Sequence, residues 1–238
     1  MHRTLVVIGS SSYVLRKFKP TSKYDRIIIG DRVKPEKTEY HYDEFIEYDL
    51  NNVDATQSIT NAVKGSNDIC VLFSSFGRVR MDVRSDIDDI LLSMKMNCVQ
   101  PLNLFGQLTL KYPCESITGV FLSSMYASVA PKPSNYTGTS PINPLYYGVA
   151  KAGVEQGIKW LSSQNKKHRF NAIAVGPIPT TSVCENDPRL ISKLKESMPS
   201  KELVSKRELS KTINWLLDSS MNGLRGATIP LDGGYTIW

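Results

Sequence analysis

The sequence predicts an α/β fold, a doubly wound parallel sheet that forms a single domain over residues 1–238. Short apolar runs alternate with helical patterns along the whole chain, which is typical of right-handed βαβ units. The 238 residues are 41% apolar and 22% charged, enough for one full hydrophobic core. The sequence contains no internal repeat and no low-complexity linker that would divide it. One domain is therefore expected.

Seven apolar runs are expected to be strands. They cover residues 4–8, 26–30, 45–48, 68–73, 117–123, 170–175 and 227–230. The run from Leu5 to Ile8 is too short for the core of a signal peptide, so it is better explained as the first strand.

Six helical patterns separate these runs. They cover residues 12–18, 54–64, 84–110, 144–164, 188–197 and 206–217. Pro20 shortens the first of them, because proline cannot continue a helix. Strands that alternate with helices in this way predict a parallel sheet covered on both faces.

Composition excludes several classes of protein. No stretch approaches the roughly 18 to 20 apolar residues of a membrane span. The four cysteines, Cys70, Cys98, Cys114 and Cys184, are scattered without metal-ligand spacing, and the chain has only three histidines. We therefore expect a reduced cytoplasmic protein without a metal site. The formal net charge is +6, and the lysines and arginines are spread along the chain, where they usually form a solvated surface. They could also favour an anionic ligand such as a nucleotide or a nucleotide-sugar diphosphate. No pattern typical of nucleic-acid binding is present.

One group of residues indicates chemistry. Tyr147 and Lys151 lie four residues apart, 23 residues after Ser124, so a helix would place both side chains on one face. An ammonium beside a phenol lowers the pKa of the phenol, and a serine hydroxyl can hold a carbonyl oxygen in front of it. The spacing alone is weak evidence, because Tyr13 and Lys17 repeat it. Its position, after a strand end and at a helix start, is where open α/β sheets bind ligands.

With these residues in this order, the chain resembles the short-chain dehydrogenases/reductases over nearly its whole length. Residues 226–234, ending in Asp-Gly-Gly, are similar to the last strand of that family, and residues 170–180 resemble the strand and turn that cover the nicotinamide. The resemblance implies a Rossmann-type fold that binds NAD or NADP. It also implies a catalytic set consisting of Asn97, Ser124, Tyr147 and Lys151.

The resemblance gives each member of this set a role. Tyr147 would be the general acid and base, and Ser124 would hydrogen-bond the reacting oxygen. Lys151 would lower the pKa of the phenol and bind the nicotinamide ribose. Asn97 would relay protons through water. The two long helical patterns correspond to those through which the family pairs subunits, which implies a homodimer or a homotetramer.

The first turn departs from the pattern of the family. Of three expected glycines only Gly9 remains, because Tyr13 and Leu15 replace the others, although residues 10–12 can still offer serine hydroxyls and amides to a phosphate. At the end of the second strand, Asp31 favours NAD and Arg32 could pair with the 2′-phosphate of NADP, with a slight preference for NAD. The expected cofactor-binding residues are Gly9, Ser11, Ser12, Tyr13, Asp31, Arg32, Asp49, Leu50, Ser74, Ser75, Gly77, Tyr147, Lys151, Pro177, Ile178 and Thr180.

The substrate is expected to be sugar-like. Residues 123–132 and 136–140 are similar to family members from bacterial surface-polysaccharide or flagellar-sugar pathways. The substrate-binding residues would be Ser124, Tyr126, Tyr136 and Tyr147. The expected reaction is reversible hydride transfer between a ketone and a secondary alcohol. Two alternatives stay open: reduction of a small ketone or β-ketoacyl group, and a dinucleotide-binding sensor or partner subunit without turnover.

Overall fold

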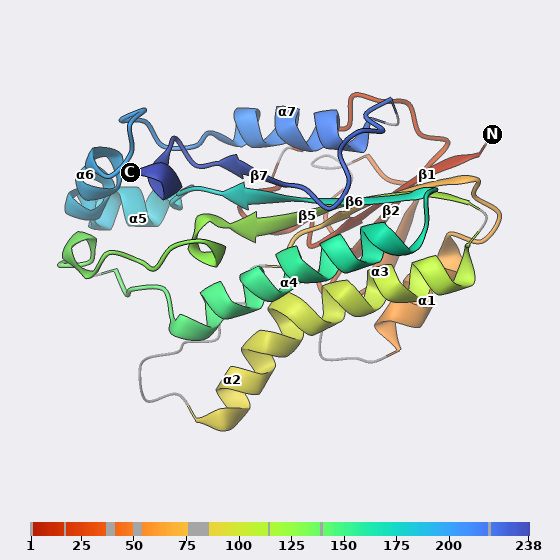
Figure 1. Ribbon diagram of the computed structural model, residues 1–238, viewed down its shortest axis with the longest axis horizontal. Helices are drawn as coiled ribbons and strands as arrows, with labels where there is room; N and C mark the ends of the chain where they lie inside the picture. The colour runs from red at the N-terminus through yellow and green to blue at the C-terminus, as the bar shows by residue number, and fades with distance from the viewer. Residues whose placement is uncertain are drawn as a thin grey trace.

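The computed structural model describes residues 2–16, 18–36, 41–49, 54–75, 86–113, 115–138, 140–218 and 220–238. Within these residues, seven parallel strands form one sheet in the order β3-β2-β1-β4-β5-β6-β7 (Figure 1). The strands are β1 (Arg3–Ile8), β2 (Arg26–Asp31), β3 (Glu44–Glu47), β4 (Asp68–Phe73), β5 (Ser116–Ser124), β6 (His168–Val175) and β7 (Thr228–Leu231). The fold class and all seven predicted strands are confirmed, with bounds that differ by no more than two residues.

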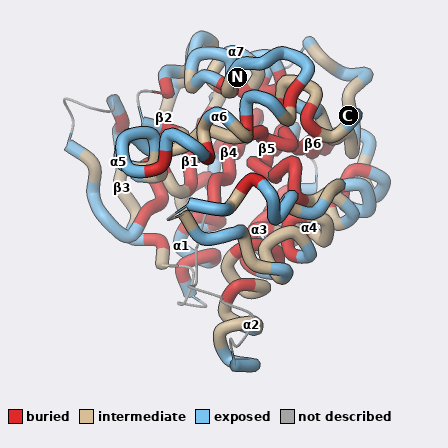
Figure 2. The backbone as a smooth tube through the Cα atoms, turned by 90° about the vertical axis from the view of Figure 1, so that its left-hand side faces the viewer, coloured by how far each residue is buried: buried red, intermediate tan, exposed pale blue. Residues whose placement is uncertain are grey.

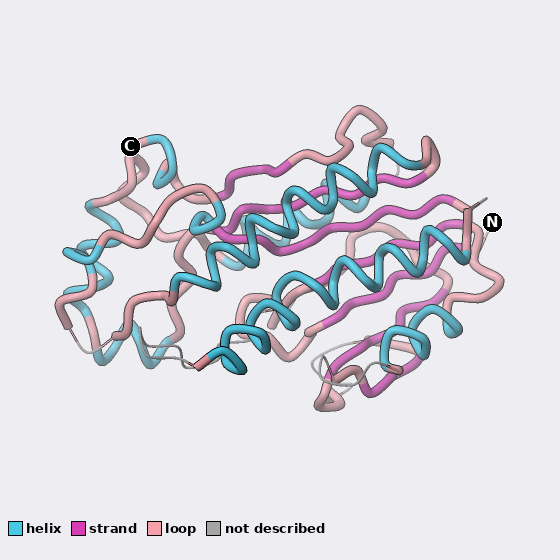
Figure 3. Tube along the Cα trace, turned by 60° about the horizontal axis from the view of Figure 1, so that its bottom comes forward, coloured by secondary structure: helices cyan, strands magenta, loops and turns pink. Residues whose placement is uncertain are grey.

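Helices cover both faces of the sheet. In the described part of the chain they are α1 (Ala55–Ala62), α2 (Ile87–Met94), α3 (Gln100–Lys111), α4 (Leu145–Gln164), α5 (Thr181–Asn186), α6 (Pro188–Glu196) and α7 (Lys206–Leu217). Helices α1, α3 and α4 pack on one face, and α7 packs on the other (Figures 1 and 3). Helices α5 and α6 lie beyond the carboxyl ends of the strands (Figure 1).

Strand β1 illustrates how the sequence builds two cores. Val6 and Ile8 belong to the hydrophobic cluster under α1, α3 and α4, whereas Leu5 and Val7 belong to the cluster under α7. Successive residues of a strand point to opposite faces of the sheet, and both faces are covered by helices. All four side chains are therefore buried. The central strands therefore form the buried middle of the molecule (Figure 2).

The predicted helix over residues 12–18 is wrong. Residues 10–16 form a succession of turns in the structure, with short-range bonds such as Leu15 N–H to the Ser12 carbonyl at 3.0 Å. Serine side chains compete for backbone groups, and β-branched Val14 disfavours helix, so the sequence here has little helical preference. The α7 face therefore has one helix fewer than expected.

The predicted helix over residues 84–110 is divided. Residues 84 and 85 lie outside the described residues; α2 begins at Ile87, and Lys95–Val99 forms a π-helical turn before α3. Pro101 stands in the first turn of α3 and lacks the N–H that would continue the ladder of hydrogen bonds, which accounts for the wider turn before it. Helix α5 was not predicted; the Thr180 hydroxyl caps it by accepting the N–H of Val183 at 3.4 Å.

Candidate active site

A cavity of about 500 Å³ opens at the carboxyl ends of β1, β2, β4, β5 and β6. It brings together most of the residues that the sequence marked. Those on its wall are Gly9, Ser11, Ser12, Tyr13, Asp31, Arg32, Asp49, Ser74, Ser75, Ser124, Tyr126, Tyr147, Ile178 and Thr180. Carboxyl ends of parallel strands form the ligand-binding edge in folds of this type.

The turn after β1 packs tightly against the end of β4. Gly9 has φ of +76°, and a Cβ at this position would lie 2.1 Å from the Ser74 carbonyl oxygen. The Ser12 hydroxyl lies 3.1 Å from the Ser74 hydroxyl and joins the same two segments. A side chain at position 9 is therefore excluded by both backbone conformation and space, which explains why this glycine remains.

The side chains at the two positions where the glycine of the family is replaced point in different directions. Tyr13 lines the cavity, and the ammonium of Lys206 lies 3.3 Å from the centroid of its ring. Leu15 is buried in the cluster under α7. Because no helix forms here, Leu15 has no helix to push outward, and it serves instead as a core residue.

Asp31 is engaged by the same turn. Its Oδ2 accepts hydrogen bonds from the Ser10 hydroxyl at 3.2 Å and the Ser11 N–H at 2.7 Å. Its Oδ1 accepts from the Ser11 hydroxyl at 3.0 Å and the Arg32 N–H at 2.8 Å. A carboxylate has about four acceptor positions, so ribose hydroxyls would have to displace the serine hydroxyls to reach it.

Ser124 and Tyr147 face the cavity from two elements that fit closely together. Ser124 is the last residue of β5, and its Oγ accepts the N–H of Tyr126 at 3.2 Å. Tyr147 stands in the first turn of α4. The next residue, Gly148, lies against the Tyr126 carbonyl, where a Cβ would come within 2.5 Å of the oxygen. Close contact at Gly148 therefore fixes the start of α4, and with it Tyr147, against the segment that follows Ser124.

Lys151 lies behind the cavity wall and is fully buried. Its ammonium donates to the carbonyl oxygens of Ser75 at 2.6 Å and Leu122 at 3.0 Å, and lies 5.6 Å from the centroid of the Tyr147 ring. Burial lowers the pKa of Lys151 to about 7, against the opposing influence of Cys98 and Glu155. Lys151 can therefore gain and lose a proton near neutral pH.

Asn97 is also buried away from the cavity wall, to which the preceding residue Met96 contributes. It belongs to the π-helical turn, and its amide donates to the Ser93 carbonyl at 3.1 Å. Tyr136 likewise stays off the wall, but its hydroxyl lies 2.5 Å from that of Tyr126, which reaches the cavity.

The remaining predictions divide into two groups. Pro177 is not on the wall of the cavity, whereas its neighbour Gly176 is. Leu50 and Gly77 lie outside the described residues.

The residues of the wall that sequence reasoning missed are Ile8, Val14, Tyr48, Met96, Met125, Asn143, Val175 and Gly176. Several of them end or follow predicted strands, and that position was the available signal.

The described residues contain neither a candidate metal cluster nor a helix that could span a membrane. No group of three or more histidine, cysteine, aspartate or glutamate side chains there could hold a metal ion. None of the helices described is long and apolar enough to cross a membrane.

Comparisons with known proteins find relatives of this chain. A family model described as enoyl-(acyl carrier protein) reductase matches residues 28–236, so the match begins after the altered first turn. The enoyl-[acyl-carrier-protein] reductase [NADH] of Synechocystis is 32% identical over 108 residues, or 43% of this chain and 42% of that enzyme. The chain thus matches about two fifths of the length of the first such relatives. A second enzyme of that description from Rhizobium meliloti is 24% identical over 90% of this chain and 80% of its own.

Among solved structures, a short-chain dehydrogenase from Leptospira borgpetersenii with bound NAD+ superposes with a TM-score of 0.82. It is 16% identical, and the superposition covers 99% of this chain and 93% of the other. This likeness concerns the fold.

Proposed function

This chain belongs to the short-chain dehydrogenase/reductase family, and from that premise we propose that it transfers a hydride between NAD or NADP and a carbonyl-bearing substrate. One observation carries the proposal. Ser124 and Tyr147 face a single cavity that extends to the serine-rich turn after β1, while the ammonium of Lys151 stands behind the phenol.

The residues fit a dinucleotide. The turn at residues 9–12 can offer backbone N–H groups and hydroxyls to the pyrophosphate, and Asp31, Arg32 and Asp49 lie where the adenosine half would reach. When bound, the nicotinamide supplies or accepts the hydride. We keep the slight preference for NAD, although the engagement of Asp31 by Ser10 and Ser11 makes this choice depend on the serine hydroxyls moving aside.

The protein side chains would manage the oxygen and its proton. Ser124 would hold the carbonyl oxygen by a hydrogen bond, and Tyr147 would give that oxygen a proton as negative charge develops on it. Lys151, when protonated, favours the phenolate left behind and so lowers the pKa of the phenol. Asn97 would act from the π-helical turn by relaying protons. The reverse reaction uses the same groups in the opposite order.

For the substrate, the relatives favour an acyl thioester over the sugar-like compound expected from the sequence. A β-ketoacyl thioester would take the hydride at the ketone carbon, and the oxygen would take the proton from Tyr147 to give a secondary alcohol. A 2-enoyl thioester would take the hydride at its β-carbon, while the electron pair moves onto the thioester oxygen and the α-carbon is then protonated. Both reactions need an oxygen held beside a phenol.

The sugar-like substrate remains a second candidate, supported by the similarity of residues 123–140 to sugar-pathway members. Tyr126 and Tyr136 would then use their linked hydroxyls to contact the sugar. A homodimer or homotetramer, as the family forms, stays part of the proposal.

The decisive experiment is a titration of the purified protein with NADH and with NADPH, followed by nicotinamide fluorescence and thermal stabilisation. We expect micromolar binding of at least one. Absence of binding to the folded protein would overturn the oxidoreductase proposal and leave a protein that retains the catalytic set without turnover.

A substrate panel then separates the candidates. We expect oxidation of the bound reduced cofactor with acetoacetyl-coenzyme A or crotonyl-coenzyme A, and none with cyclohexanone. Turnover restricted to a keto-sugar nucleotide would reject the thioester and support the second candidate.

A further inference from the structure

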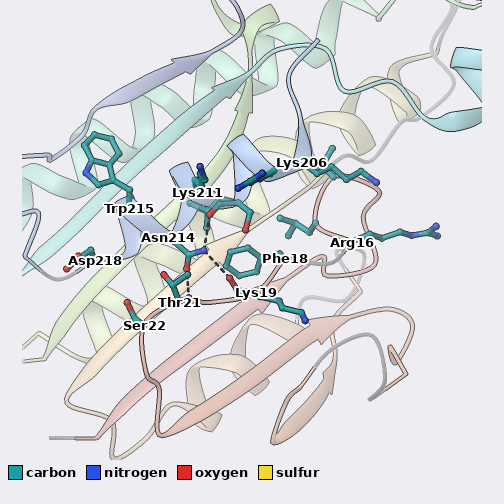
Figure 4. Close-up of a pocket in the computed structure, with 15 residues that line it drawn as sticks. Arg16, Phe18, Lys19, Thr21, Ser22, Lys206, Lys211, Asn214, Trp215 and Asp218 are labelled. Atoms are coloured by element: carbon teal, nitrogen blue, oxygen red, sulfur yellow. Dashed lines mark hydrogen bonds between the residues drawn. The ribbon is translucent and has the colours of Figure 1, made fainter. Parts of the chain in front are cut away.

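A second cavity, of about 640 Å³, lies on the face of the sheet that α7 covers (Figure 4). One wall is formed by residues 14–16, 18, 19, 21 and 22, and the other by one side of α7. Residues 14–16 of this wall belong to the turns that stand in place of the expected helix. It adjoins the cavity that contains Ser124 and Tyr147, and Val14 is the lining residue that the two cavities share.

The charge of this cavity is strongly one-sided. Arg16 and Lys19 come from one wall, and Lys206, Arg207 and Lys211 from the other. Asp218, at the far end of the cavity beside Trp215, is the only carboxylate among the lining residues that the structure describes (Figure 4). Cations gathered in one concave surface repel one another and concentrate anions there.

These cations are available to a ligand. Within the described residues, Arg16, Lys19 and Lys211 form no ion pair with a carboxylate. The nearby carboxylate of Glu208 is used instead in the capping box of α7, where it accepts hydrogen bonds from the backbone and hydroxyl of Ser205. The cations of the cavity therefore outnumber the described carboxylates near them, which are Asp218 on the wall and Glu208 close to Lys211.

The floor of the cavity is fixed and largely apolar. Asn214 of α7 ties the two walls together: its amide donates to the Lys19 carbonyl at 3.0 Å, and its oxygen accepts the Thr21 N–H at 2.8 Å. Phe18 and Ile213 are buried in the core below, and Phe18 lies between Asn214 and the basic end of the cavity (Figure 4). The site thus combines fixed apolar surface with cations at its rim.

We propose that this cavity binds a small organic polyphosphate, of the nucleoside triphosphate class, with its phosphates on the cations and its organic part against the apolar part of the wall. The volume suits a small molecule, since ligand cavities usually measure about 300–1,000 Å³. A two-fold contact centred on this cavity is disfavoured, because it would place the cations of one cavity against the same cations of the other. The proposal does not depend on the catalytic function.

The test is isothermal titration with ATP at about 50 mM salt, where screening is weak. If NADH or NADPH binds, the titration is done with that cofactor at saturation, so that ATP cannot enter the cavity that contains Ser124 and Tyr147. If neither cofactor binds, the titration is done with the free protein. We compare the variant Lys19→Ser/Lys211→Ser with the charge-matched control Lys166→Ser/Lys167→Ser, whose lysines are exposed in the loop between α4 and β6.

We expect ATP to bind the natural chain and the control within about two-fold of each other, and the Lys19/Lys211 variant at least about ten-fold more weakly, because two charged contacts are lost. Inorganic triphosphate should bind more weakly than ATP, since it has no organic part to contact the apolar part of the wall. Equal weakening in both variants, ATP that displaces the bound cofactor, or no binding at all would overturn the proposal. Inorganic triphosphate that binds as tightly as ATP would reject the nucleotide class. Circular dichroism of both variants verifies that they are folded.

Discussion

Ser11 is held to Asp31 by two hydrogen bonds, one of 2.7 Å from its backbone N–H and one of 3.0 Å from its hydroxyl. The carboxylate is buried, and it joins the end of β2 to a turn that has lost two of the glycines of its family. In this chain Asp31 therefore organises the turn itself, in addition to any part that it has in selecting the cofactor.

Replacing Asp31 by alanine should weaken the binding of NADH and the binding of NADPH to a similar extent, about ten-fold each. It should also lower the melting temperature by several degrees. The Ser11 N–H would lose its acceptor in a partly buried place, which costs about 1–3 kcal/mol. Fluorescence titration and thermal unfolding measure both effects, with Asp88→Ala, an exposed carboxylate of α2, as the control. A change in the NADH/NADPH ratio without loss of stability would instead assign Asp31 to selectivity alone.

Gly9 and Gly65 offer a matched pair for the close contact under the turn. Both have positive φ, but a Cβ on Gly9 would lie 2.1 Å from the Ser74 oxygen, whereas a Cβ on Gly65 meets nothing within 4 Å. The backbone conformation should cost each alanine variant about 1–2 kcal/mol. Gly9→Ala adds an overlap, typically about 1–3 kcal/mol more, and should also abolish cofactor binding. Equal free energies of unfolding in denaturant titrations would contradict the close contact between the turn and β4.

Tyr147→Phe should reduce kcat by roughly 10²-fold or more while leaving cofactor affinity within a few fold, because the ring remains and only the proton donor is removed. Tyr146→Phe is the control, since it removes the neighbouring hydroxyl, which is not on the cavity wall. Single-turnover oxidation of the reduced cofactor measures the step directly. Turnover of Tyr147→Phe at the level of the natural chain would remove Tyr147 from the mechanism.

Lys151 should make the stability of the protein depend on pH. Burial lowers the pKa of its ammonium to about 7, from 10.5 for an unperturbed lysine, so between these pH values the unfolded chain binds a proton that the folded protein does not. Stability then rises with pH across this window, by at most about 1.4 kcal/mol per pH unit, and the gain is absent below pH 7.

The measurement is the free energy of unfolding at several pH values between 7 and 10. Lys151→Met should remove this component of the slope, whereas Lys159→Met, which removes an exposed lysine of the same helix, should keep it. Comparing variants is essential, because burial also raises the pKa values of Cys70 and Cys98, and these thiols contribute to the slope with the opposite sign. Parallel slopes for Lys151→Met and the natural chain would show that the buried ammonium keeps its charge.

The sheet could be predicted from the sequence because buried parallel strands leave a strong local signal. The run from Asp68 to Phe73, all of it buried, was predicted to the residue. The absence of a helix at residues 12–18 could not be predicted. The four-residue spacing of Val14 and Phe18 suggests a helix, whereas the serines and Pro20 favour turns, and a hydrophobic pattern does not take turn chemistry into account. The π-helical turn before Pro101 depends on a single missing N–H.

The position of the candidate site could be predicted from the ends of the strands and from the start of the helix that carries Tyr147. The carboxyl ends of parallel strands all lie at one edge of the sheet, so residues that follow the strands meet there. What could not be predicted was the use of each polar group. Asp31 reads as a ribose acceptor in the sequence, and only the folded turn reveals that Ser10 and Ser11 already bond to it. Lys151 is likewise recognisable, but not its burial behind the wall.

Val14 lines both cavities, and Lys206 of the basic cavity covers the ring of Tyr13 on the wall of the other. One short segment thus lines two neighbouring cavities. Suppose that a ligand bound in one cavity shifts this segment and so changes the affinity of the other cavity for its own ligand. Thermodynamic linkage then requires that the second ligand change the affinity for the first by the same factor. If both proposed ligands bind, the turns that replace the expected helix are the segment through which occupancy of one cavity would influence the other.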